Sequence, residues 1–251
     1  MTIGYETYGR GARKVVVLHG WFGDQTFMAP MRDALSADEF TYVFPAYRGY
    51  GASKSQTGAY TVEEISADVR GLIDSLGYGE VSLVGHSMGG KFIQRVAVDA
   101  PGRIRRMVAI TPVPAAAVPF DEQGWALFSG AAENIGNRRG IIDFTTGSRL
   151  SGAWLDAMAQ ASWGNSTHEA FAGYLLAWAK TGFHEAVVGN EVPVKVIVGQ
   201  YDGAINAETM KATFLQWFKH AELEEIANAG HYPMNETPVA LATSMEAFLR
   251  A

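Results

Sequence analysis

The chain has 251 residues, no cysteine and a formal net charge of −6, and 48% of its residues are hydrophobic while 18% are charged. This composition is typical of a globular protein and excludes a disordered chain. The lack of cysteine excludes disulfides, a thiolate metal site and a catalytic thiol. No basic stripe and no apolar run of about 18 residues is present, so we expect no nucleic acid and no membrane as partners. No basic leader precedes an apolar core, so we expect a cytoplasmic protein.

Short apolar runs alternate with helical patterns along the first 112 residues. An edge strand is expected at residues 3–8. A helix is expected within residues 26–35, and it starts late because Pro30 is tolerated only in a first turn. A capping box of Thr61 and Glu64 predicts the start of the next helix. Parallel strands need crossover connections, so this alternation predicts an α/β fold with a mostly parallel central sheet and helices on both faces. The apolar strand runs are 14–18, 41–44, 81–84 and 104–110.

The pattern changes between residues 113 and 188, where aromatic residues follow helical or irregular spacing. We interpret residues 113–188, the cap segment, as a helical cap inserted into a core of residues 1–112 and 189–251. The adjacent Arg138 and Arg139 are interpreted as part of a solvated face. Most aromatic residues here are expected to be packing, but the insertion point predicts that some line an apolar pocket. The candidates are Trp21, Trp125, Phe128, Phe144, Trp154, Trp163 and Trp178.

The sheet pattern resumes after the cap segment. Strands are expected at 192–198 and 223–226, and helices at 206–218 and 236–249. In open α/β sheets, sites lie at the carboxyl ends of the strands. Reactive side chains are therefore expected directly after the apolar runs.

The strand at 81–84 is followed by Gly85, His86, Ser87, Met88 and Gly89. A serine between two glycines, after a strand and before a helix, is typical of a nucleophile elbow, in which a strained turn exposes the hydroxyl. The alternative is a glycine-rich connection with a capping serine. The setting of strand, turn and helix favours the nucleophile.

A serine hydroxyl needs a base, and the base needs a carboxylate to orient it. His231 follows the last strand in a glycine-flanked loop and is the best base, while His19 and His86 are interpreted as structural. Asp202 ends a strand on the same edge and is the preferred acid, with Asp121 as the second candidate. The order Ser, Asp, His is the one expected for an elbow of this kind.

The backbone N–H groups of Met88 and Trp21 are the expected donors to an oxyanion, and the Trp21 indole is expected to line the acyl side. The sequence contains no dinucleotide fingerprint, no P-loop and no H-E-x-x-H motif, so we expect no cofactor and no metal.

These residues resemble a known family. The chain is similar to capped serine hydrolases of the α/β-hydrolase fold, a group of esterases, lipases, lactonases and cofactor-free haloperoxidases. Two departures stand out: Ala46 replaces a common aspartate and leaves Arg48 without an obvious partner, and Lys91 stands where an apolar residue is common. The motifs that carry the resemblance are residues 19–21, 48–53, 85–90, 199–202 and 230–233.

The resemblance implies hydrolysis of carboxylic esters of small to medium, largely apolar molecules through an acyl-enzyme. Ser87 argues against the haloalkane dehalogenases and epoxide hydrolases of this fold, which use an aspartate at the elbow. The alternatives are a hydrolase of carbon–carbon bonds in vinylogous diketones, a perhydrolase or haloperoxidase, and a ligand-binding receptor with slow turnover. The oligomeric state, monomer or homodimer, stays open.

Overall fold

The computed structural model describes residues 2–251 and contains a seven-stranded sheet. The spatial order is β1-β3-β2-β4-β5-β6-β7; β1 runs antiparallel to β3, and the other neighbours are parallel. This arrangement confirms the predicted α/β-hydrolase fold. The strands are β1 (Tyr5–Tyr8), β2 (Arg13–Leu18), β3 (Phe40–Pro45), β4 (Val81–His86), β5 (Ile104–Ile110), β6 (Val194–Gly199) and β7 (Ala221–Ile226).

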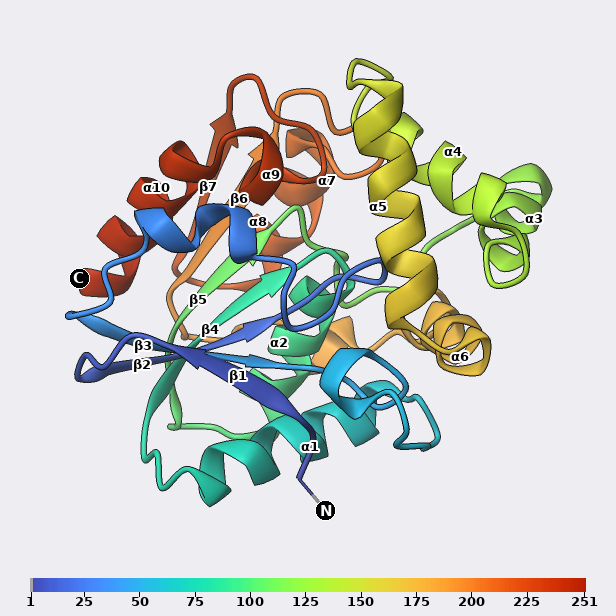
Figure 1. The fold of residues 1–251 in the computed structure, drawn as a ribbon. Coiled ribbons are helices and arrows are strands. Elements are labelled where there is room, and N and C mark those ends of the chain that lie inside the picture. Colours follow the sequence, from blue (N-terminus) through green and yellow to red (C-terminus); the bar gives the residue numbers. More distant parts are fainter. Residues whose placement is uncertain (1) are drawn as a thin grey trace.

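Helices cover both faces of the sheet (Figure 1). Helices α1 and α2 pack together on one face, and α10 packs with η1 on the other. The α-helices are α1 (Val62–Ser75), α2 (Met88–Asp99), α3 (Glu122–Gly130), α4 (Ile135–Thr145), α5 (Gly152–Asn165), α6 (His168–Lys180), α7 (Ala207–Ala212), α8 (Phe214–Trp217), α9 (Pro233–Glu236) and α10 (Pro238–Arg250). The 3₁₀ helices are η1 (Ala29–Ala34), η2 (Gly51–Ser53) and η3 (His184–Ala186).

The central strands are apolar because both of their faces are covered. Every residue of β3 and β4 is buried, whereas the edge strand β7 is exposed along much of its length. Strands buried on both faces read as continuous apolar runs, whereas an exposed edge strand does not. The predicted bounds lie within two residues of the observed ones for the inner strands and for the edge strands.

Helix α1 begins much as predicted, with one difference in its cap. The Thr61 hydroxyl accepts a hydrogen bond from the Glu64 N–H at 3.1 Å. The Glu64 carboxylate reaches further back than a capping box requires and accepts from the N–H groups of Ala59 and Tyr60, at 3.1 and 2.8 Å. The first turn is therefore fixed to the loop that precedes it.

The same helix supplies the partner that Arg48 lacked in the sequence. The Arg48 guanidinium donates two hydrogen bonds to the Asp68 carboxylate, at 2.7 and 2.8 Å. A bidentate pair of this kind has a fixed geometry. It holds the glycine-rich loop after β3 against α1.

Three predicted helices have different forms in the structure. The segment expected at 26–35 is the 3₁₀ helix η1, with Pro30 in its first turn. The helix expected at 206–218 is divided into α7 and α8, because Thr213 has a non-helical backbone (φ −123°, ψ −88°). The helix expected at 236–249 begins at Pro238, because the residue before a proline disfavours the α conformation and Thr237 lies outside it (φ −142°, ψ 55°).

The cap segment contains the four helices α3 to α6, which follow β5 and precede β6 in the chain. Figure 1 shows them together at one side of the sheet, next to the carboxyl ends of the central strands. The interpretation of Arg138 as solvated is wrong: its side chain is fully buried, donates to the carbonyls of Ala131 and Ser162, and lies 3.5 Å from the centre of the Phe171 ring. Among the described helices, none combines the length and apolar character needed to cross a lipid bilayer.

The close approach of α2 to the sheet depends on glycine. A Cβ added at Gly85 would overlap the carbonyl oxygen of Gly89, and one added at Gly89 would overlap the carbonyl oxygen of Leu18 at the end of β2. Both obstacles are backbone atoms, which cannot rotate away as a side chain can. Only a residue without a Cβ lets strand, turn and helix meet here.

We expect Gly89→Ala to lower the free energy of unfolding by about 1–3 kcal/mol, because the added methyl group must push α2 away from β2. Urea denaturation measures this change. The control is Gly71→Ala on α1, where an added Cβ meets no atom within 4 Å. That variant should be neutral or more stable by about 0.5–1 kcal/mol, as alanine favours helix over glycine. Equal effects of the two substitutions would contradict the steric explanation.

Candidate active site

Ser87 forms the turn between β4 and α2 and has a strained backbone. Its φ of 53° and ψ of −118° lie in a region that residues other than glycine rarely adopt. Hydrogen bonds hold it there: the Ser87 N–H donates to Ile110 O at 2.9 Å, and its carbonyl accepts from the N–H groups of Gly90 and Val113 at 2.8 and 3.0 Å. Met88 follows as the first residue of α2, so its N–H has no acceptor within the helix.

Asp202 and His231 are joined by a short hydrogen bond. The distance from His231 Nδ1 to Asp202 Oδ2 is 2.6 Å, and both side chains are buried. The other carboxylate oxygen, Oδ1, accepts from the N–H groups of Ala204 and Ile205, both at 2.9 Å. The carboxylate therefore has a fixed orientation, and Nε2 is the imidazole atom that remains for chemistry.

The backbone of His231 is held by the elbow and by the neighbouring strand. Its carbonyl accepts hydrogen bonds from His86 Nε2–H at 2.8 Å and from the Thr111 hydroxyl at 3.1 Å. Its N–H donates to Thr145 O at 3.1 Å, at the end of α4. Burial lowers the pKa of His86 well below its usual value, so His86 stays neutral and acts as a donor to this carbonyl.

Both ring nitrogens of His19 bond to neighbouring backbone groups, which agrees with the structural role expected from the sequence. Its Nδ1–H donates to Gly20 O at 2.8 Å, and its Nε2 accepts from the Tyr47 N–H at 3.4 Å. Complete burial lowers its pKa to about 4. A neutral ring with both nitrogens in use is a structural element of the loop after β2.

Trp21 lies on that loop, and three neighbours fix its position. Its carbonyl accepts from the Tyr50 hydroxyl at 3.0 Å, and its indole N–H donates to Phe171 O on α6 at 2.7 Å. The indole stacks on Phe171, with ring centres 4.0 Å apart, and on Phe128 at 5.9 Å. The side chain thereby connects the loop after β2 to the cap segment.

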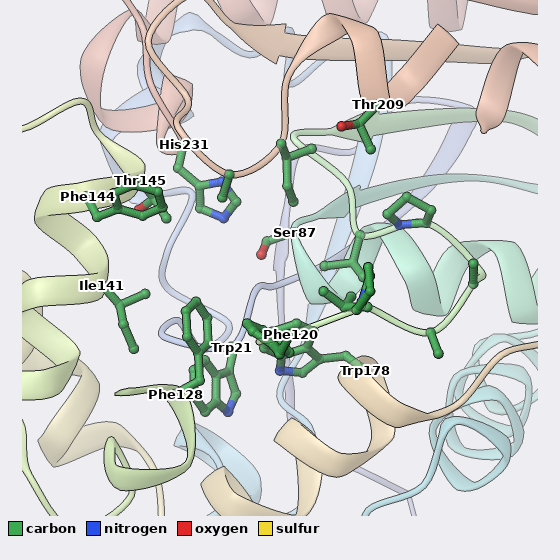
Figure 2. Close-up of a pocket in the computed structure, with 18 of the residues that line it drawn as sticks. Trp21, Ser87, Phe120, Phe128, Ile141, Phe144, Thr145, Trp178, Thr209 and His231 are labelled. Carbon is green, nitrogen blue, oxygen red and sulfur yellow. The ribbon is translucent and has the colours of Figure 1, made fainter. Parts of the chain in front are cut away.

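Ser87 and His231 line one cavity of about 570 Å³. Figure 2 shows them facing the same hollow, with Trp21, Phe120, Phe128 and Trp178 gathered across from them. No Asp, Glu, Lys or Arg is among the described residues that line it. Most of the lining is apolar: Trp21, Phe22, Val113, Pro114, Ala116, Ala117, Val118, Pro119, Phe120, Phe128, Ile141, Phe144, Trp178, Ala204 and Ile205, with the polar Ser87, Thr145, Thr209, Thr213 and His231.

Four of the seven candidate pocket residues line this cavity: Trp21, Phe128, Phe144 and Trp178. The other three lie outside it, in separate packing roles. Trp125 packs on Phe120 and beneath the Lys180 ammonium, Trp154 meets the edge of Tyr232, and Trp163 packs on Arg138 and His168.

Several residues that line the cavity were not among the candidates predicted from the sequence. The strip 113–120 directly after β5 supplies much of the wall, and Thr209 and Thr213 contribute from the region of α7. The sequence indicates these residues only through their position in the chain, after strands that end at the carboxyl edge of the sheet. Asp121, the second candidate for the acid, instead caps α3, where its exposed carboxylate accepts from the Gly124 N–H at 2.7 Å.

With the geometry established, comparison with known proteins assigns the family. Residues 14–238 match the family model described as the alpha/beta hydrolase fold, and the chain belongs to this family. It is 23% identical to 3-oxoadipate enol-lactonase 2 of Acinetobacter baylyi over 100% of this chain and 94% of that protein.

A second relative matches over a shorter stretch. The acetyltransferase component of the acetoin cleaving system of Cupriavidus necator, a dihydrolipoyllysine-residue acetyltransferase, is 34% identical over 43% of this chain. The match spans only 29% of that protein's length.

Among solved structures, an esterase from Exiguobacterium antarcticum has a TM-score of 0.88 at 17% identity, covering 99% of this chain and 96% of that one. The structural match agrees with the family assignment in showing the same fold.

We expect stability to fall as the pH drops from about 6.5 towards 4. The folded pKa of His19 lies near 4, below the 6.5 of an unfolded histidine, so protons bind the unfolded chain first. The contribution of the neutral His19 to the free energy of unfolding, about 3 kcal/mol, is therefore fully present above pH 6.5 and is lost as the pH falls to about 4. Urea denaturation at pH 7 and pH 4.5 measures the loss.

The His19→Gln variant should show a smaller fall in stability over this pH range. The control is His220→Gln, which changes an exposed histidine before β7 and should leave the pH dependence as in the unsubstituted protein. If His19→Gln loses as much stability between the two pH values as the unsubstituted protein, the buried neutral histidine is not the cause.

Proposed function

We propose that the protein is a serine hydrolase that cleaves carboxylic esters of small to medium apolar molecules. The observation that carries this proposal is the hydrogen bond between Asp202 and His231 at the wall of the cavity that Ser87 also lines. A strained serine, a histidine and a buried carboxylate around one cavity have the composition of a nucleophile, a base and an orienting group. Esterase and lactonase relatives of the family support the same class of reaction.

In the proposed mechanism, Ser87 Oγ attacks the acyl carbon while His231 Nε2 takes its proton. Asp202 stabilises the imidazolium through the hydrogen bond at Nδ1. The N–H groups of Met88 and Trp21 donate to the oxyanion. His231 then returns the proton to the leaving alcohol, and a water molecule, activated by the same histidine, releases the acid from Ser87.

The lining of the cavity supports an uncharged substrate. A charged group that leaves water needs a partner of opposite charge, and the described lining offers no lysine, arginine or carboxylate. Aromatic rings from Trp21, Phe128 and Trp178 would pack on an apolar acyl or alcohol group. Phe144, which is 54% exposed, lies where the substrate would enter.

Ser87→Ala should lower kcat/KM for p-nitrophenyl butyrate by roughly 10³-fold or more, because it removes the hydroxyl that forms the acyl-enzyme in the proposed mechanism. A fluorophosphonate should label the unsubstituted protein at Ser87, as measured by peptide mass spectrometry. The matched control is Ser82→Ala, which removes a buried hydroxyl from β4 and should keep the activity. Retention of most of the esterase activity by Ser87→Ala would refute the assignment of the nucleophile.

Turnover of other substrates separates the alternatives. A hydrolase of carbon–carbon bonds would act on a vinylogous diketone faster than on any simple ester. A receptor would show one slow turnover and a thermal shift with its ligand, whereas repeated fast turnover of esters excludes it.

A negative charge on the acyl chain should reduce hydrolysis. Mono-p-nitrophenyl succinate has nearly the shape of p-nitrophenyl butyrate but ends in a carboxylate. We expect its kcat/KM to be lower by roughly 100-fold, because the carboxylate would lose water without gaining a cation. The methyl ester of the succinate, which removes the charge, should recover most of the rate. Equal rates for butyrate and succinate would show that the substrate chain does not enter this cavity.

A further inference from the structure

A lysine lies buried in the helix that follows Ser87. Lys91 is the fourth residue of α2, and its side chain is fully buried within the described structure. A charged group that leaves water loses its hydration, so the buried ammonium calls for a local explanation.

The Lys91 ammonium donates to three backbone carbonyls. Nζ lies 3.0 Å from Ala116 O, 2.8 Å from Trp178 O and 2.5 Å from Thr181 O. An ammonium group has three donors, and each one has an acceptor here. Ala116 lies near the start of the cap segment, whereas Trp178 and Thr181 lie at and just after the end of α6, near its other end.

The two ends of the cap segment also contact each other at this point. The Val118 N–H donates to Ala179 O, and the Phe183 N–H donates to Ala115 O, both at 2.8 Å. The Phe183 ring lies 5.9 Å from the Lys91 ammonium. Lys91 thus lies beneath a junction where the chain enters and leaves the cap segment.

This junction forms part of the wall of the cavity that Ser87 lines. Ala116 and Trp178 both line that cavity. A shift of the junction by a fraction of an ångström would move both residues relative to Ser87.

Lys91 has two opposing effects on stability. Burial lowers the pKa of Lys91 to about 7, which reflects the free energy needed to keep a charge away from water. Removal of the lysine would abolish this unfavourable contribution, but it would also leave three buried carbonyls without their donor, which is itself unfavourable. A methionine would fill the space without a buried charge, but it could not hold the three carbonyls.

We propose that Lys91 is a positioning residue: through the carbonyls of Ala116, Trp178 and Thr181, it holds both ends of the cap segment at a fixed place relative to the helix that carries the nucleophile. It thereby sets the width of the cavity between Ser87 and Trp178. The part of this inference that concerns substrates rests on the proposed esterase function, whereas the part that concerns the cap segment does not.

The test compares Lys91→Met with Lys195→Met. The second variant makes the same substitution on β6, where Lys195 pairs with Glu222 and Glu224 on β7. Hydrogen exchange, read by mass spectrometry without substrate, should become roughly tenfold faster in residues 113–120 and 178–188 of Lys91→Met only. The faster exchange should be confined to these two segments, because these are the parts of the chain whose carbonyls lose their donor.

Kinetics supply the second measurement. For p-nitrophenyl hexanoate, Lys91→Met should raise KM roughly tenfold and change kcat by less than about twofold, because binding is impaired and the chemistry is not. The short p-nitrophenyl acetate should be nearly unaffected, and Lys195→Met should leave both KM values unchanged. If Lys91→Met does not fold, Lys91→Gln, which keeps a shorter donor, replaces it with the same expected directions.

The outcomes separate the two proposals. Unchanged hydrogen exchange in both segments together with unchanged KM would overturn the positioning role. Faster exchange in those segments, in a protein that hydrolyses no ester even with Lys91 intact, would support the positioning role and refute the esterase function.

Discussion

The hydrogen bond from His86 Nε2–H to the His231 carbonyl connects the two halves of the site. His86 directly precedes Ser87, and His231 lies 145 positions further along the chain. Because this one contact joins the turn after β4 to the loop after β7, the distance between serine and imidazole depends on it. Thr111 supports the same carbonyl from β5, the strand that separates β4 from β6 in the sheet. Burial lowers the pKa of His86, so the neutral imidazole makes this bond away from water.

Polar groups of the core also hold the cap segment, and most of them donate to its backbone carbonyls. The Trp21 indole donates to Phe171 O, Lys91 to three carbonyls, and Lys54 to Gly164 O at 2.6 Å. Carbonyl oxygens are present whatever the side chain is. The cap segment can therefore change its side chains, and with them the cavity lining, without losing these attachments.

The sequence alone predicted the fold, and it selected Ser87, Asp202 and His231, which the structure brings together around one cavity, because each of these features depends on a local pattern. Buried parallel strands read as apolar runs, glycines mark the turn at Ser87, and Asp202 and His231 follow strands at one edge. Helix ends and pocket walls depend on tertiary contacts. Neither the break at Thr213 nor the burial of Arg138 has a local signature, and Trp163 cannot be distinguished from Trp178 by residue type. The direction in which an aromatic residue of a short helix points is set by its neighbours.

The positive φ of Ser87 has a consequence for how this chain can change over evolutionary time. A glycine at position 87 would adopt this backbone conformation without strain, so selection for stability alone would favour it. Serine at this point is a compromise in which some resistance to unfolding is given up to keep a hydroxyl in place. A lineage that no longer needed the hydroxyl would be expected to lose it early, and the residue at this turn would record whether the chain is still an enzyme.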